Sequence, residues 1–241
     1  MTAAETAPDG IAVVIPTYNE RENIGRLIRA VLALSARYSV VVVDDNSPDG
    51  TGDVVDRLAK EYPGRVEVMH RPTKEGIGPA YIAGFGVALA SNAGFIAQMD
   101  ADLSHNPVDL AHLVQAATGA DVVLGSRYIQ GGGTIGWPRH RLLISRVGGW
   151  YARKVLGVPV ADLTSGFKVF RRSALDALDF NSVRSDGYSF QIELTYRALR
   201  RGLRVVEVPI VFTDRVAGAS KLSRRIVIEA IIVVWRMRLR G

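Results

Sequence analysis

Five short apolar runs, each followed by a polar turn and a segment of helical length, organise the first half of this chain. The runs are Ile11–Ile15, Val40–Val43, Val66–Met69, Phe95–Met99 and Val122–Leu124. Short apolar runs of this length are typical of buried strands, and Val40–Val43, which is β-branched throughout, should be buried on both faces. Because strands that alternate with helices over short connections form parallel sheets, the pattern predicts an α/β fold with a doubly wound, mostly parallel sheet.

Polar residues and prolines mark where the intervening helices should begin. Asn19 followed by Glu22 is typical of an N-cap with a capping box. Pro79 suits the first position of a later helix, and Asn106 suits a cap in front of Pro107. We therefore expect helices to begin at these three places.

The second half of the chain is less regular. After Tyr128 the segment IQGGGTIGWP predicts an irregular loop whose four glycines would let it move near a ligand site. A helix is expected from about Arg139 to Leu156, another over Tyr188–Arg201, and a single strand over Arg204–Phe212. The chain has no recognisable linker, so these elements should complete one domain.

The two ends of the chain differ in character from this domain. We predict a disordered tail at residues 1–10, the main domain at 11–222 and an apolar, basic, amphipathic helix at 223–241 that packs on the domain or lies at a membrane surface. Residues 1–10 lack the cationic start and apolar core of a signal peptide. Arg224, Arg225, Arg236, Arg238 and Arg240 flank the run Ile226–Trp235, which is too short to span a bilayer and contains Glu229.

Composition restricts the chemistry only broadly. The chain has no cysteine, which excludes disulfides and thiolate metal sites and fits a reducing compartment. A net charge of +6 and a sequence pI near 9.8 favour an anionic partner, such as phosphate groups, a nucleic acid or a membrane surface. Composition alone does not choose among these.

The run Phe95–Met99 ends in two carboxylates, Asp100 and Asp102. Because side chains alternate along an extended chain, both carboxylates should point to one side and Ala101 to the other. Ligands of open α/β sheets bind at the carboxyl ends of strands, and two like charges there favour a hard cation with oxygen ligands. The alternative is a solvated acidic loop. We expect His105 on the surface, because no second His or Cys stands near it to complete a metal site.

Three of the predicted strands end in polar clusters, which parallel pairing would place along one edge of the sheet. The clusters are PTYNE, DDNSPDGT and DADLS. No G-x-G-x-x-G follows the first strand, so a dinucleotide site of the Rossmann type is not expected. The glycines of EGIGPAYIAGF follow the third strand instead and predict loop and helix packing. Of the adjacent carboxylates Asp44 and Asp45, we expect Asp44 to hold the turn.

Six segments in order, PTYNE, VVVDDNSPDGT, MDADLSHNP, GSRY, DLTSGFKVF and DRVAGASKL, resemble the motifs of the family 2 glycosyltransferases. The resemblance covers roughly residues 11–235 and is greatest to the dolichol- or polyprenol-phosphate mannosyltransferases. It implies the GT-A fold, a Rossmann-like doubly wound sheet in a single domain. It also implies an inverting enzyme that moves mannose from GDP-mannose to a polyprenyl phosphate with the help of Mg²⁺ or Mn²⁺.

The same resemblance implies roles for individual residues. Pro16, Tyr18, Glu20, Val43 and Asp45 would hold the nucleoside, and Asp100, Ala101 and Asp102 the diphosphate, through a metal bound by the two carboxylates. Arg127, Arg215 and Lys221 match positions around the donor phosphates, and Arg127, Arg141 and Ser145 match positions at the acceptor phosphate. Asp100, Asp102 and Arg127 are thus the catalytic candidates. Ser104 departs from relatives that carry a Gln there, which leaves a third protein ligand open.

Structural alternatives exist for these residues. Asp45 could form a turn, Glu20 could occupy the first turn of a helix, and Arg127 could be a solvated surface residue. Arg215 and Lys221 could lie in a solvated turn. Arg141 could be an exposed helix residue, and Ser145 a small residue packed between helices.

Two other functions also stay open: transfer of glucose from UDP-glucose to the same kind of lipid, and a non-catalytic module that binds a nucleotide sugar or a nucleic acid. The DAD carboxylates oppose nucleic acid, since an acidic groove repels a polyanion.

A lipid acceptor would place the protein in the cytoplasm, bound peripherally to an anionic membrane surface at the cytoplasmic face, with an integral membrane protein as a further candidate partner. A phosphate acceptor also predicts that no general base is needed. A phosphate monoester has a second pKa of about 6 and is already largely dianionic at neutral pH. A hydroxyl acceptor, in contrast, usually needs a positioned base.

Overall fold

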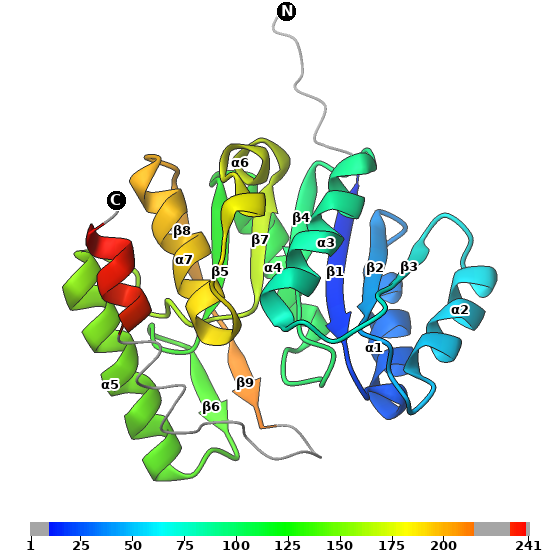
Figure 1. The fold of residues 1–241 in the computed structure, drawn as a ribbon, viewed down its shortest axis with the longest axis horizontal. Helices are drawn as coiled ribbons and strands as arrows, with labels where there is room; N and C mark the ends of the chain where they lie inside the picture. The colour runs from blue at the N-terminus through cyan, green and yellow to red at the C-terminus, as the bar shows by residue number, and fades with distance from the viewer. Residues whose placement is uncertain (1–9, 215–231, 240–241) are drawn as a thin grey trace, which may run out of the picture.

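The computed structural model describes residues 10–214 and 232–239, which form three layers with the sheet in the middle (Figure 1). The sheet has seven strands in the order β3-β2-β1-β4-β7-β5-β8. Its members are β1 (Ile11–Thr17), β2 (Tyr38–Asp44), β3 (Val66–His70), β4 (Phe95–Gln98), β5 (Val122–Ser126), β7 (Lys168–Arg171) and β8 (Val205–Pro209). All pairings are parallel except those of β7, which runs antiparallel between β4 and β5. The predicted doubly wound, mostly parallel sheet of the GT-A type is confirmed.

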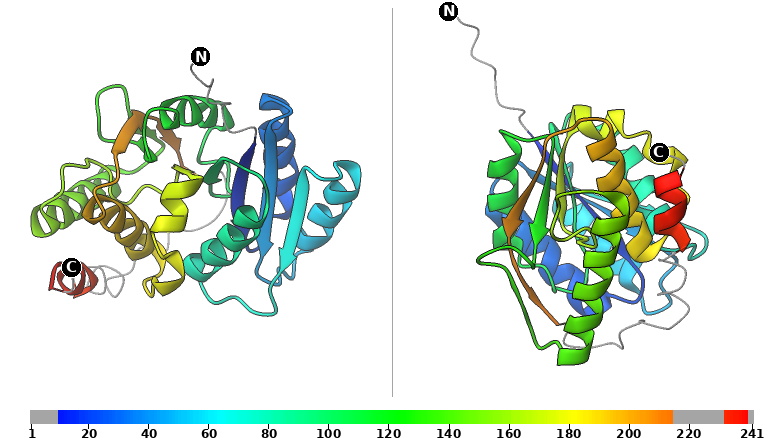
Figure 2. Two further views of the ribbon diagram at one scale, coloured as in Figure 1. Left: turned by 90° about the horizontal axis from the view of Figure 1, so that it is seen from above. Right: turned by 90° about the vertical axis from the view of Figure 1, so that its left-hand side faces the viewer.

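Helices cover both faces of this sheet (Figure 2). They are α1 (Arg21–Leu34), α2 (Thr51–Glu61), α3 (Ile77–Ala90), α4 (Pro107–Ala117), α5 (Arg139–Leu156), α6 (Arg172–Ala177) and α7 (Gly187–Arg200), with a short 3-10 turn at Phe180–Ser182. Residues of α1, α2 and α4 share one buried core, and residues of α3, α5, α6 and α7 share the other. In β2, Val40 and Val42 pack into the first core while Val41 and Val43 pack into the second. The expectation that Val40–Val43 is buried on both faces is therefore confirmed.

The start of α1 differs from the prediction. Asn19 has a left-handed backbone (φ 61°), Glu20 takes the N-cap position, and no capping box forms. The amide of Glu20 donates instead to the Thr51 hydroxyl at 2.9 Å, and the amide of Arg21 donates to the Asp49 carboxylate at 3.1 Å. The turn after β2 therefore supplies the cap of α1 from about thirty residues away in sequence, which a local pattern does not reveal.

Two other helix starts were also predicted. Asn106 caps α4 as expected, because its side chain accepts a hydrogen bond from the amide of Val108 at 3.1 Å. Helix α3 begins at Ile77 rather than Pro79. The Asp186 carboxylate accepts from the amide of Gly78 at 2.7 Å and so satisfies the additional turn.

The predicted strand Arg204–Phe212 is divided in the structure. Strand β8 ends at Pro209, the Ile210 side chain enters the core, and the chain continues as β9 (Val211–Thr213). Strand β9 pairs in parallel with β6 (Gly133–Ile135), a strand inside the segment predicted to be an irregular loop. The single-strand and loop predictions were wrong here because each partner needs the other to form.

The ends of the described chain lie against the domain. The carbonyl of Gly10 accepts hydrogen bonds from the amides of Gly94 and Phe95, so this residue of the predicted tail belongs to the fold, whereas residues 1–9 lie outside the described part. Residues 232–239 form a helix whose Val234 is buried in the same core as Leu156 of α5 (Figure 1). Arg224, Arg225 and Arg240 fall outside the described residues. No helix in ranges 10–214 and 232–239 has the length and apolarity needed to cross a bilayer.

Helix α3 owes its close approach to the sheet to Gly84. A Cβ atom at Gly84 would lie 2.3 Å from Val14 Cγ1 and 2.9 Å from Val43 Cγ2, whereas one at Gly86 would meet no atom within 4 Å. We predict that Gly84→Ala lowers the free energy of unfolding by about 1–3 kcal/mol through overpacking. Gly86→Ala is the matched control on the exposed side of the same helix, and it should raise stability by up to about 1 kcal/mol. Equal stability of the two variants in urea denaturation would contradict this packing.

Candidate active site

The side chains after β4 alternate as an extended chain requires, with Asp100 on the side opposite to Met99 and Ala101. Met99 and Ala101 pack into the core formed with α1 and α4. Asp100 turns to the other side, where its Oδ1 accepts from the Tyr81 hydroxyl of α3 at 3.1 Å. The Asp102 side chain accepts from the amide of Ser104 at 3.1 Å, and the residue is only 8% exposed. Ala101 therefore contributes apolar packing, and the carboxylates are the polar members of this turn.

A divalent cation is compatible with this pair of carboxylates. Within the described ranges, no third acidic residue or histidine joins Asp100 and Asp102 in a cluster able to ligate a metal. Mg²⁺ is commonly held by one or two carboxylates, with substrate phosphates and water as the remaining ligands. Two hard oxygen donors at the ligand edge of the sheet therefore fit a cation that is shared with a diphosphate.

His105 was expected on the surface, and this prediction is wrong. The residue is 2% exposed, and its ring stacks on Phe167 with the centroids 4.8 Å apart. Its Nδ1 accepts from the amide of Asp100 at 3.3 Å. Burial lowers the pKa of His105, although the charges of Asp100 and Asp102 act in the opposite direction. His105 is thus a neutral support for the Asp100 turn rather than a solvated side chain.

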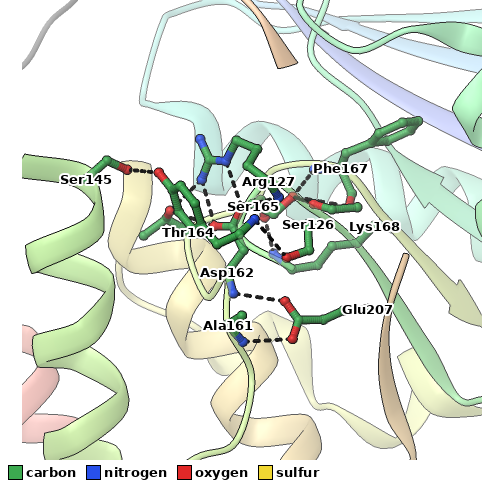
Figure 3. A network of polar contacts seen from close by, with 12 residues as sticks. Ser126, Arg127, Ser145, Ala161, Asp162, Thr164, Ser165, Phe167, Lys168 and Glu207 are labelled. Carbon is green, nitrogen blue, oxygen red and sulfur yellow. Dashed lines mark hydrogen bonds and ion pairs between the residues drawn. The ribbon is translucent and has the colours of Figure 1, made fainter. Parts of the chain in front are cut away.

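Arg127 begins the loop after β5 and makes a buried ion pair with Asp162 (Figure 3). Arg127 Nε and Nη2 each donate to one Asp162 carboxylate oxygen at 2.7 Å, and the Arg127 amide donates to the same carboxylate at 3.1 Å. Nη2 also donates to Thr164 at 2.7 Å, while Nη1 donates to no described residue. Burial alone would raise the pKa of Asp162, but Arg127 holds it below its ordinary value. Arg127 is therefore a fixed cation and not the solvated group of the alternative reading.

The remaining acceptor-site candidates gather near Arg127. Arg141 lies in the first turn of α5, where its Nη1 donates to Asp214 at 2.8 Å. Ser145, one turn further on, accepts from the Tyr128 hydroxyl at 2.6 Å. The Trp137 ring connects the two guanidinium groups: Arg141 Cζ lies 4.1 Å from its centroid and Arg127 Cζ lies 5.4 Å away. The structure therefore brings Arg127, Arg141 and Ser145 into one neighbourhood.

At the other end of the edge, β1 and β2 carry the nucleoside candidates. Asp44 is buried and accepts from the hydroxyls of Thr17 at 3.0 Å and Ser47 at 2.6 Å, which confirms its structural role. Asp45 Oδ1 lies 3.0 Å from Arg71 Nη1, without the alignment of a hydrogen bond. Burial raises the pKa of Asp45, against the lowering effect of Arg71. Asp45 and Arg71 thus present an acceptor and a donor side by side.

The other nucleoside candidates have mixed surroundings. Tyr18 is 37% exposed, and the ammonium of Lys74 lies 3.5 Å from its ring centre. The Glu20 carboxylate accepts from the Asn23 side chain at 2.9 Å, which matches the helix-start alternative. Pro16 is partly buried, whereas Val43 is fully buried, so only its backbone can face a ligand. Arg215 and Lys221 fall outside the described residues.

Several supporting residues were not predicted from sequence. Lys168 of β7 is fully buried, and its Nζ donates to the Ser165 carbonyl at 2.6 Å and to Gln191 Oε1 at 2.5 Å. Gln98 of β4 donates to the next carbonyl, that of Gly166, at 3.0 Å. These bonds hold the turn that packs on Asp100, because a Cβ on Gly166 would lie 3.4 Å from the Asp100 carboxylate. The one local signal is a lysine at the start of an apolar strand, KVF.

Known proteins provide an independent comparison. Residues 12–179 match the family described as glycosyl transferase family 2. The chain belongs to that family. This family 2 chain is 46% identical over 230 residues to a polyprenol monophosphomannose synthase of Mycolicibacterium smegmatis, with 95% of this chain and 87% of the relative covered. It is also 46% identical over 230 residues to an undecaprenyl-phosphate mannosyltransferase of Micrococcus luteus, with 94% and 93% covered.

Solved structures extend the family assignment to the fold. Glucosyl-3-phosphoglycerate synthase from Mycobacterium tuberculosis, in complex with Mn²⁺, UDP and glucosyl-3-phosphoglycerate, matches with a TM-score of 0.69 at 20% identity. The match covers 95% of this chain and 80% of that structure. The same synthase with Mn²⁺, UDP and phosphoglyceric acid matches with a TM-score of 0.70, covering 95% and 78%. These similarities establish the shared fold of this family 2 enzyme.

Burial lowers the pKa of Lys168 to about 7. An unfolded chain keeps this lysine protonated up to about pH 10.4, so between these values the unfolded state binds a proton that the folded state does not. The contribution of Lys168 to stability is therefore complete above about pH 10.4 and is lost as the pH falls through about 7.

We predict that the wild-type free energy of unfolding rises between about pH 7 and 9.5 by about 3 kcal/mol more than that of Lys168→Met. Urea denaturation at both pH values measures the difference. Lys60→Met, at an exposed position of α2, is the control and should keep the wild-type rise. The same pH dependence in Lys168→Met as in the wild type would refute the buried, neutral lysine.

Proposed function

We propose that this protein transfers a mannosyl group from GDP-mannose to the phosphate of a polyprenyl lipid, with inversion at the anomeric carbon. The names of the two relatives at 46% identity support the sugar and the acceptor. One observation carries the proposal: the carboxylate pair after β4 and the guanidinium pair lie beside the same cluster of aromatic rings, which includes His105 and Phe212. His105 accepts from the Asp100 amide, its ring lies 5.4 Å from Phe212, and Arg127 Cζ lies 5.6 Å from that same ring. Donor and acceptor, both anionic, would each find a suitable group there.

On the donor side, Asp100 and Asp102 would hold Mg²⁺ or Mn²⁺, which supplies positive charge to the departing diphosphate. The protein's own residues orient these carboxylates, through the Tyr81 hydroxyl at Asp100 and the Ser104 amide at Asp102. Asp45 can accept from base or ribose donors, and the adjacent Arg71 can donate to base acceptors. Arg215 and Lys221 remain candidates for the donor phosphates on sequence grounds.

On the acceptor side, Arg127, Arg141 and Ser145 would bind the lipid phosphate. Guanidinium groups and a hydroxyl are suited to phosphate oxygens, and the ion pair with Asp162 prevents Arg127 from moving away. The acceptor dianion needs no base, because its oxygen attacks the sugar carbon without losing a proton. The residues at this end therefore position the phosphate and partly neutralise it.

A polyprenyl acceptor requires contact with a membrane, and we propose that one face of α5 provides it. Leu143, Ile144, Val147 and Trp150 are 45–63% exposed on this helix. Ile232, Trp235 and Leu239 of the neighbouring C-terminal helix are exposed as well, while Arg139, Arg146, Arg236 and Arg238 add exposed positive charge. Apolar side chains bordered by arginines suit an anionic membrane surface. The cytoplasmic face and an integral membrane partner remain part of the proposal.

Asp102→Asn tests the donor side. Loss of an electrostatic contact to developing charge commonly lowers kcat on the order of 100-fold or more, and we predict such a loss for transfer from GDP-mannose to a polyprenyl phosphate. The circular dichroism spectrum should stay unchanged, and Mn²⁺ binding measured by electron paramagnetic resonance should weaken. Asp109→Asn on α4 is the control and should retain activity. Full activity of Asp102→Asn, or wild-type transfer that persists in EDTA, would refute a cation site at this pair.

A flotation assay tests the membrane face. We predict that the double variant Leu143→Ser, Val147→Ser floats less than the wild type with vesicles that contain anionic lipid, because it removes two apolar contacts from the surface of α5. Val108→Ser on α4 is the matched control, since Val108 is 56% exposed and Val147 54%, and it should float like the wild type. Equal flotation of all three proteins would contradict the proposal that α5 contacts the membrane.

A further inference from the structure

The ion pair between Arg141 and Asp214 lies where the proposed acceptor phosphate would bind. Arg141 Nη1 donates to Asp214 Oδ1 at 2.8 Å, and the two side chains are 12% and 28% exposed. The Trp137 ring packs against the Arg141 guanidinium with its centre 4.1 Å from Cζ. Arg141 Nε is buried and has no hydrogen-bond partner among the described residues. The guanidinium is therefore held in place by an aromatic face and by one carboxylate oxygen.

The neighbouring pair of Arg127 and Asp162 is built differently. Asp162 uses both carboxylate oxygens on Arg127, its side chain is 0% exposed, and its amide donates to Glu207 at 2.9 Å. An incoming anion could not displace that carboxylate without breaking several buried hydrogen bonds. The Asp214 side chain, in contrast, is 28% exposed, so water can solvate this carboxylate when a ligand takes its place on Arg141. Of the two carboxylates, Asp214 is the one that can exchange with a ligand.

The backbone allows such an exchange to be local. The amide of Asp214 donates to the Ile135 carbonyl at 2.8 Å, which ties Asp214 to the end of β6. A Cβ atom at Gly136 would lie 3.1 Å from the Asp214 Cβ, so glycine leaves space for this side chain. A change of rotamer at Asp214 can therefore release Arg141 while the β6–β9 pairing stays in place.

We propose that Asp214 is a positioning residue that exchanges places with the acceptor phosphate on Arg141 and pairs with Arg141 again once the product has formed. The inference rests on the function proposed above. A phosphate monoester with a charge near −2 competes well with a carboxylate of charge −1 for the guanidinium. In the acceptor-free site, Asp214 keeps Arg141 oriented against Trp137.

The charge balance of the reaction gives the exchange its direction. A phosphate oxygen of the acceptor forms a bond to the anomeric carbon, and the bond from that carbon to the diphosphate breaks, with its electron pair leaving on the diphosphate. No proton is transferred, so the acceptor phosphate changes from a dianion to a singly charged diester. A diester binds a guanidinium more weakly than the dianion does. Asp214 can then recover Arg141, which favours release of the product.

Binding measurements on the full chain can separate these states. The probes are farnesyl phosphate for the acceptor, farnesyl methyl phosphate for the diester product, and farnesol for the lipid alone, titrated by calorimetry at about pH 7.5, where the monoester is a dianion. We expect Arg141→Gln to weaken the binding of farnesyl phosphate by about tenfold and to leave the affinities for the diester and for farnesol unchanged. We expect Asp214→Asn to increase the affinity for farnesyl phosphate by about fivefold.

The double variant gives the most specific result. In the Asp214→Asn background, Arg141→Gln should weaken the binding of both the monoester and the diester, because the diester gains access to Arg141 only when Asp214 no longer competes. Asp214→Glu, which keeps the carboxylate, should behave like the wild type. A purely structural role for Asp214 would not make the effect of Arg141→Gln depend on the charge of the ligand.

Two outcomes would overturn the exchange. One is that Arg141→Gln weakens the diester as much as the monoester in the wild-type background, a comparison that needs no substitution at Asp214. The other is that Asp214→Asn folds and leaves both affinities unchanged. If the wild type binds farnesyl phosphate no better than farnesol, the proposed acceptor fails, and this inference fails with it. Mannosyl transfer with normal binding of farnesyl phosphate would keep the proposed function even if the exchange is refuted.

Discussion

The buried ion pair between Arg127 and Asp162 joins the parts of the site that the sequence keeps far apart. Arg127 follows β5, and Asp162 precedes the turn that leads into β7, the antiparallel strand between β4 and β5. Because β7 runs against its neighbours, the turn in front of it lies at the carboxyl ends of β4 and β5, between Asp100 and Arg127. Breaking a buried pair of this kind costs about 3–5 kcal/mol, since it leaves a charge without its partner. The pair therefore fixes both the turn and the guanidinium.

The consequence is a site with two electrostatic halves. Carboxylates face the end where β1, β2 and β4 meet, and arginines lie toward β5 and α5. Under the proposed function, the carboxylates would bind the anionic donor through a divalent cation, and the arginines would bind the anionic acceptor directly. Lys168 and Gln98 stabilise this arrangement by donating hydrogen bonds to carbonyls of the turn beside Asp100. The exposed apolar face of α5 then begins one or two residues from Arg141 and Ser145, which suits a substrate with an ionic head and a lipid tail.

Much of this arrangement was predictable from sequence, for physical reasons that differ between residues. The strands at the five apolar runs, the Asn106 cap and the structural role of Asp44 follow from local patterns, and each is confirmed. The cap of α1, the pairing of β6 with β9 and the partner of Arg127 depend on contacts between residues far apart in the chain, which no local pattern contains. His105 was misplaced because only its lack of a nearby metal-ligand partner was considered, whereas its burial depends on stacking against Phe167, which lies far away in the chain. The roles of the candidate site residues in binding remain predictions.

Transfer of labelled mannose tests the central claim most directly. The purified protein would be incubated with a short polyprenyl phosphate and, in parallel, with labelled GDP-mannose or UDP-glucose, each with Mg²⁺, with Mn²⁺ or with EDTA. The account predicts a labelled polyprenyl phosphate sugar from GDP-mannose, with β stereochemistry from an α-linked donor, only when a divalent cation is present. Transfer from UDP-glucose alone would contradict the donor, and transfer that continues in EDTA would contradict a cation at Asp100 and Asp102. Failure to transfer from either donor to a polyprenyl phosphate would contradict the function as a whole.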